Sequence, residues 1–104
     1  MMWKIAICGL GSAAARIHLP ACKKLPGVEV VGGFDLKAPR QSLPFPLFES
    51  MQEMLAASEP NIVIIATPTE SHHELTKAAL DAGCHVLCEK PFMNSLDQAK
   101  DILA

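Results

Sequence analysis

Short apolar segments alternate with amphipathic segments along the 104-residue chain. Residues 3–8 and 61–66 are almost unbroken apolar runs, a pattern typical of strands buried on both faces of a parallel sheet. Residues 28–34 and 85–88 predict two further strands, and residues 45–48 predict a short extended segment. Because helical patterns separate the strands, the chain is predicted to be an α/β protein with a parallel sheet and flanking helices.

The segments between these strands carry apolar residues at helical spacing. Three helices are predicted, over residues 12–24, 50–57 and 71–82. Ser71 and Glu74 are spaced as a capping box at the start of the third helix. Ser95 and Gln98 repeat that spacing and predict the start of a last helix. Residues 36–46 contain three prolines and no helical period, so they are predicted to form a loop.

Composition limits the classes of function. Half of the residues are hydrophobic and 19% are charged, so residues 1–104 are expected to fold as one domain. The net charge of −2 excludes a basic surface for nucleic acid. Since no apolar run reaches the ~20 residues of a membrane span, we expect no membrane partner and a cytoplasmic location.

The cysteines and histidines do not predict a metal site. The four cysteines lack a paired CxxC spacing and are expected to be buried free thiols. His72 and His73 are adjacent, so they face different sides of the predicted helix and make a poor metal pair. His18 and His85 are predicted to be packing residues, because histidine is commonly partly buried. No metal is therefore expected.

The first apolar segment ends in a glycine-rich turn that reads Gly9-Leu10-Gly11-Ser12-Ala13-Ala14. This run fits GxGxxG with alanine in the last position, and it lies between a predicted strand and a predicted helix. There Gly9 permits a tight turn and Gly11 lets the backbone approach a pyrophosphate. Backbone amides at Ser12 and Ala13, at the positive end of the helix dipole, are the predicted pyrophosphate donors. The alternative is a glycine turn that serves packing alone.

Asp35 favours the binding interpretation. It follows the second predicted strand, about 20 residues after the glycine motif, where a dinucleotide-binding domain carries the acid that holds the adenosine ribose. Its charge would repel a 2′-phosphate, so NAD is the expected cofactor. Lys37 and Arg40 are close enough in sequence to leave NADP as the alternative. The motif and Asp35 together predict a Rossmann-type sheet.

Further blocks complete a family pattern. They are His18-Leu19-Pro20-Ala21, Ala66-Thr67-Pro68-Thr69 with His72, and Ala82-Gly83-Cys84-His85-Val86-Leu87-Cys88-Glu89-Lys90-Pro91. With the glycine loop and Asp35, this order resembles the N-terminal NAD(P)-binding Rossmann domain of the Gfo/Idh/MocA oxidoreductases, named for glucose-fructose oxidoreductase and inositol dehydrogenase. The resemblance runs from Ile5 to about Ile102.

The resemblance implies roles for matched residues. It implies that the nicotinamide side of the cofactor site consists of Thr67, Pro68, Thr69, His72, Glu89 and Lys90. Lys90 is similar to the family lysine that contacts the cofactor and the reacting hydroxyl, so it is the expected catalytic residue. A lysine beside a cationic nicotinamide ring has its ammonium form disfavoured, which suits it to proton exchange.

The chain also departs from the family it resembles. Those proteins run to several hundred residues and carry a second α/β domain that covers the nicotinamide. This chain is expected to be truncated before the last strand or strands of the Rossmann domain and to lack the C-terminal substrate domain. An exposed sheet edge would then permit a homo-oligomer. Residues 36–48 are proline-rich where the family usually has a helix.

Two functions follow from the sequence. The first is the NAD(P)-binding domain of an oxidoreductase that transfers hydride between the cofactor and the CH–OH group of a sugar, polyol or related alcohol. A second domain or chain would have to complete its substrate site, so catalysis by this chain stays undecided. The second is a non-catalytic dinucleotide-binding or partner-docking module. Binding of NADH, followed by a turnover assay on a polyol panel, distinguishes them.

Overall fold

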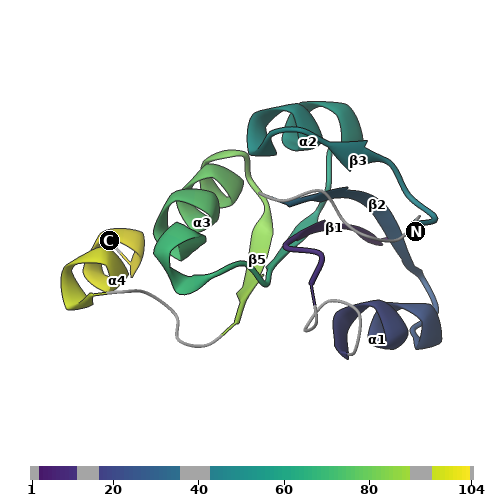
Figure 1. Cartoon of the computed structure of the whole chain (residues 1–104), viewed down its shortest axis with the longest axis horizontal. Coiled ribbons are helices and arrows are strands. Elements are labelled where there is room, and N and C mark those ends of the chain that lie inside the picture. Colours follow the sequence, from purple (N-terminus) through teal and green to yellow (C-terminus); the bar gives the residue numbers. More distant parts are fainter. Residues whose placement is uncertain (1–2, 12–16, 36–42, 90–94, 104) are drawn as a thin grey trace.

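The computed structural model describes residues 3–11, 17–35, 43–89 and 95–103, and these residues build an α/β fold on one parallel sheet (Figure 1). The strands are β1 (Trp3–Cys8), β2 (Val28–Phe34), β3 (Leu47–Phe48), β4 (Ile62–Ile65) and β5 (His85–Cys88). They lie in the order β3-β2-β1-β4-β5, and every pair is parallel. The predicted fold class is confirmed. The strand order reverses direction between β1 and β4, the position where such sheets bind ligands at the carboxyl ends of their strands.

Helices cover both faces of the sheet. The described helices are α1 (Leu19–Lys24), α2 (Met51–Ser58), the 3₁₀ turn η2 (Thr69–Ser71), α3 (His72–Asp81) and α4 (Leu96–Leu103). Helices α2 and α3 lie on one face of the sheet and α1 lies on the other (Figure 1). Helix α4 lies beside α3, where Asp101 accepts hydrogen bonds from His73 Nε2 at 2.7 Å and Lys77 Nζ at 3.1 Å.

The alternation of side chains in β1 divides the core into two clusters. Ala6 and Cys8 pack with buried residues of α2 and α3, whereas Ile5 and Ile7 pack with Cys22 of α1. These four residues of β1 are each at most 5% exposed. The unbroken apolar run in the sequence is thus explained by helices on both faces of this central strand.

The two glycines of β2 permit a close approach of aromatic rings. A Cβ on Gly32 would lie 2.8 Å from Phe48 Cε2, and a Cβ on Gly33 would lie 2.7 Å from Phe45 Cε1. The extended segment predicted near residues 45–48 contains the edge strand β3, which pairs with β2 at Gly33 and Phe34.

The helix starts differ from the predictions in several places. The predicted helix over residues 12–24 is described only from Ile17, and its first residues lie outside the described ranges. The capping box predicted at Ser71 is wrong, because the Ser71 side chain makes no cap hydrogen bond and instead lies 2.6 Å from Thr67 Oγ1. Ser95 does cap α4, by accepting from the Gln98 N–H at 3.2 Å. Ser50 caps α2 in the same way, a cap that the sequence analysis missed.

Strand β5 ends the described sheet on one side. It pairs with β4 alone among the described strands, and Leu87 in it is 52% exposed. Among the described helices, none is long and apolar enough to cross a membrane.

Candidate functional site

The turn after β1 requires glycine at its first position. Gly9 has φ +92°, and a Cβ there would lie 2.6 Å from both the carbonyl carbon and the oxygen of Ala66. The Gly9 N–H donates to Phe34 O at 2.7 Å. The turn is thus packed against the ends of β2 and β4. By contrast, Gly11 is exposed and a Cβ there would have no atom within 4 Å, so open space lies at its backbone. Ser12 and Ala13 lie outside the described residues.

Asp35 is fixed to the glycine turn. Its Oδ2 accepts a hydrogen bond from the Leu10 N–H at 2.6 Å, although the two residues are 25 positions apart in sequence. The side chain is half-buried at the carboxyl end of β2. A carboxylate has about four acceptor positions, so it can hold this amide and a ligand hydroxyl together. The structure therefore brings together the acid and the glycine turn that the sequence analysis paired. Lys37 and Arg40 lie outside the described residues.

The segment after β4 is held by a buried histidine. His72 is 1% exposed, and its Nε2 donates to Thr67 O at 2.8 Å. Thr67 is itself buried, Pro68 is exposed and Thr69 is half-buried. The resemblance implies that His72 contacts the cofactor, which stays a prediction; in this structure its ring is buried against the Thr67 carbonyl. In this structure it acts on the site by positioning Thr67.

The carboxyl end of β5 is joined to the start of α1. Glu89 follows β5, and its backbone N–H donates to Ile65 O at 2.9 Å, so it continues the ladder with β4. Its side-chain Oε1 lies 2.5 Å from His18 Nε2. His18 was predicted to be a packing residue; it is buried as expected, yet it has a carboxylate partner that no sequence pattern indicated. Lys90, the expected catalytic residue, lies outside the described residues.

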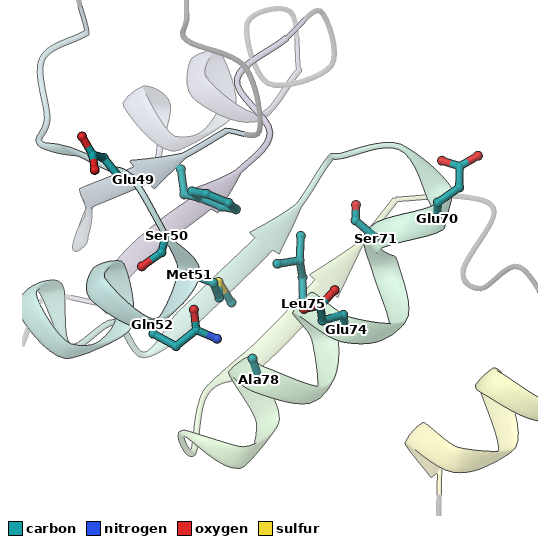
Figure 2. A pocket seen from close by; sticks show the side chains of 10 residues that line it. Glu49, Ser50, Met51, Gln52, Glu70, Ser71, Glu74, Leu75 and Ala78 are labelled. Atoms are coloured by element: carbon teal, nitrogen blue, oxygen red, sulfur yellow. The ribbon is translucent and has the colours of Figure 1, made fainter.

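A pocket of about 310 Å³ lies beside Phe34, the residue before Asp35. Side chains of α2 and α3 face each other across it, with Met51 on one helix and Leu75 and Ala78 on the other (Figure 2). The polar residues of the lining are Glu49, Ser50, Gln52, Glu70, Ser71 and Glu74. Three carboxylates make this pocket acidic, so it favours hydrogen-bond donors and disfavours a phosphate.

The described thiols are unsuited to nucleophilic chemistry. Burial, together with the smaller effect of the negative charge of Asp35, raises the pKa of Cys8 to about 12. Burial also raises the pKa of Cys22, Cys84 and Cys88. None of the four cysteines, which all lie within the described residues, forms a disulfide. Within the described ranges no group of three or more His, Cys, Asp or Glu side chains is arranged to hold a metal ion.

Fold and site together define a class of protein. A parallel sheet of this strand order, with a glycine turn hydrogen-bonded to the acid after its second strand, is a dinucleotide-binding domain of the Rossmann type. The chain belongs to the Gfo/Idh/MocA oxidoreductase family, whose model is described as an oxidoreductase family with an NAD-binding Rossmann fold and matches residues 3–104. The domain is accordingly an NAD(P)-binding domain.

Curated relatives include sugar dehydrogenases. D-glucoside 3-dehydrogenase of Escherichia coli is 32% identical over 105 residues, which cover 95% of this chain and 30% of that protein. Glucose-6-phosphate 3-dehydrogenase of Bacillus subtilis is 36% identical over 103 residues, with 94% of this chain and 29% of that protein covered. The chain thus spans about 30% of the length of these relatives.

Solved structures agree with this assignment. A myo-inositol 2-dehydrogenase from Lactobacillus plantarum superposes with a TM-score of 0.87 at 25% identity, covering 99% of this chain and 32% of that one. A putative dehydrogenase from Bordetella bronchiseptica gives a TM-score of 0.91 at 29% identity, covering 99% of this chain and 28% of that one.

Proposed function

We propose that this chain forms the cofactor-binding part of a dehydrogenase that transfers hydride between NAD and a sugar, polyol or related alcohol. The observation that carries this proposal is the hydrogen bond between the Leu10 amide and Asp35, which supports a ribose-binding role for Asp35 because the acid lies beside the glycine turn. The names of three relatives describe dehydrogenases of a D-glucoside, of glucose 6-phosphate and of myo-inositol, and these compounds carry CH–OH groups. The bound nicotinamide would supply the hydride chemistry, and this chain would bind and orient it.

The arrangement of these residues supports one direction for the dinucleotide across the carboxyl ends of the strands. The pyrophosphate would lie at the open backbone of Gly11 and the amides of Ser12 and Ala13. The adenosine ribose would bind Asp35, with the adenine directed toward the pocket beside Phe34. The nicotinamide half would then lie across β4 and β5, at residues 67–69 and at Glu89 and Lys90. This layout follows from a crevice that crosses the sheet between β1 and β4.

The charges around the adenosine side support NAD over NADP. Asp35 carries a negative charge where a 2′-phosphate would lie, and three glutamates line the adjoining pocket. Each would repel the additional phosphate. Lys37 and Arg40 are the cations that would have to offset this repulsion for NADP to bind well.

Glycine substitutions test the proposed binding mode. Gly11→Ala adds a methyl group that meets no protein atom within 4 Å, so the fold should tolerate it. The same methyl group should block the approach of a pyrophosphate and weaken NADH binding by about tenfold or more, equivalent to at least about 1.4 kcal/mol. Nicotinamide fluorescence during titration measures the affinity, and thermal unfolding measures stability.

Gly9→Ala is the contrasting variant, because its methyl group clashes with the Ala66 backbone and should destabilise the fold itself. No saturable binding of NADH or NADPH to the unmodified chain would contradict the proposed function. Binding without turnover of any polyol, in a preparation that contains a substrate domain, would favour a non-catalytic dinucleotide-binding module instead.

For Lys90 we propose a catalytic role in exchanging the proton of the substrate hydroxyl. The resemblance to the family lysine and the position directly after Glu89 support this role. Lys90→Ala should leave NADH affinity nearly unchanged and abolish turnover of an alcohol in a preparation that is otherwise active. Retained turnover would remove Lys90 from the mechanism.

We further propose that the chain self-associates through the edge of β5 and works in a reducing, cytoplasmic setting. An exposed strand edge with an exposed apolar side chain, Leu87, supports the first point. The lack of a disulfide among the four cysteines, all of them described, supports the second.

A further inference from the structure

Two side-chain bridges lie on opposite sides of the switch point between β1 and β4. On the β2 side, Asp35 binds the amide of Leu10. On the β5 side, His18 binds Glu89 across 71 positions of sequence. The first bridge belongs to the predicted ribose site, whereas the second has no role in the function proposed so far for this chain.

The geometry of the second bridge indicates a rigid connection. The distance between His18 Nε2 and Glu89 Oε1 is 2.5 Å, and the histidine side chain is 9% exposed against 35% for the glutamate. Because a carboxylate only accepts, Nε2 of His18 carries the proton and donates it. A short bond from a buried donor to a charged acceptor is stronger than a neutral bond and less screened by solvent.

The bridge also connects two segments that the sheet alone leaves separate. His18 immediately precedes α1, which packs on the face of the sheet opposite α2 and α3. Glu89 is held to β4 through its backbone N–H and stands directly before Lys90. The position of the Glu89 carboxylate is therefore set from the α1 side of the sheet.

We propose that His18 is a positioning residue for the nicotinamide half of the cofactor. It orients the Glu89 carboxylate relative to the glycine turn. This inference rests on the proposed binding of NAD. It goes beyond that proposal by assigning His18 a selective effect. The bridge supports binding of the nicotinamide riboside. It leaves binding of the ADP half unaffected, because Asp35 and the glycine turn hold that half independently.

Calorimetric titration with NADH and with ADP-ribose, which lacks nicotinamide, tests the selectivity. His18→Ala should weaken NADH binding about fivefold or more and change ADP-ribose binding less than twofold. His18→Gln retains an N–H donor near the position of Nε2 and should recover most of the NADH affinity. Glu89→Gln should also weaken NADH selectively, and combining it with His18→Ala should add little. His85→Ala, an exposed histidine at the opposite end of β5, is the matched control and should bind both ligands as the unmodified chain does.

Equal losses for NADH and ADP-ribose would show a merely structural bridge and overturn the inference, as would unchanged NADH affinity in His18→Ala. If His18→Ala does not fold, His18→Gln and Glu89→Gln decide by the same comparison of the two ligands. If the unmodified chain binds neither ligand, the proposed function fails and this inference fails with it. If it binds both and the variants lose both equally, only the role of His18 fails.

Discussion

Asp35 holds the glycine turn in this structure, and we propose that it also binds the ribose of the cofactor. Its carboxylate accepts the Leu10 amide in the protein alone, and it is proposed to accept ribose hydroxyls when NAD binds. Asp35→Ala removes charge-assisted hydrogen bonds and should weaken NAD binding by about 1 to 3 kcal/mol. Titration with NADH measures the loss, and Glu29→Ala, which changes an exposed acid on β2, is the control. An unchanged affinity would show that other residues hold the ribose.

His72 and His18 show how burial changes the role of a residue. Both are at most 7% exposed, and both donate from Nε2 to a backbone or side-chain oxygen in a segment that follows a strand. Neither ring is placed to act as an exposed acid or base. Each instead determines where a neighbouring residue, Thr67 or Glu89, presents its polar groups.

At the level of elements, α4 is attached to the rest of the molecule through a polar contact. Hydrogen bonds from His73 and then Lys77 hold the pKa of Asp101 below its ordinary value of 3.8. A carboxyl group with a lowered pKa in the folded state stabilises that state above its unfolded pKa, and the stabilisation disappears as the pH falls through the folded pKa. The contact between α3 and α4 should therefore weaken below pH 3.8.

Hydrogen exchange resolves this effect by element. Asp101→Asn at neutral pH should speed exchange in α4 and leave the amides of β1 and β4 unchanged, because the core clusters contain no buried residue of α4. Acidification of the unmodified chain should reproduce this pattern before global unfolding. Uniform acceleration in all elements would contradict the local attachment.

At the level of the whole molecule, the uncovered side of β5 should control self-association. Leu87 is 52% exposed on the terminal strand of the described sheet. Leu87→Lys should lower concentration-dependent association measured by light scattering, since a lysine on an edge strand opposes strand pairing. Leu103→Lys removes an even more exposed leucine from α4 and should have little effect. Equal effects of both variants would indicate non-specific association through exposed apolar side chains.

The chain spans about 30% of the length of its dehydrogenase relatives. The described residues provide groups suited to the adenosine and pyrophosphate parts of the cofactor. Selection of a substrate depends on groups that would face the nicotinamide from outside this sheet. The family assignment therefore establishes an NAD(P)-binding domain, and the substrate is left to experiment.

The sequence by itself determined the strands, their parallel pairing and the pairing of the glycine turn with Asp35. These features depend on local patterns in the sequence. The patterns are apolar runs, a turn that requires glycine, and an acid about 20 residues after the glycine motif. Only the tertiary structure showed that His18 meets Glu89, that His72 turns inward to Thr67, and that Ser71 does not cap its helix. Each of these contacts depends on how separate elements pack, and a side chain with several possible hydrogen-bond partners takes the one that packing brings within reach.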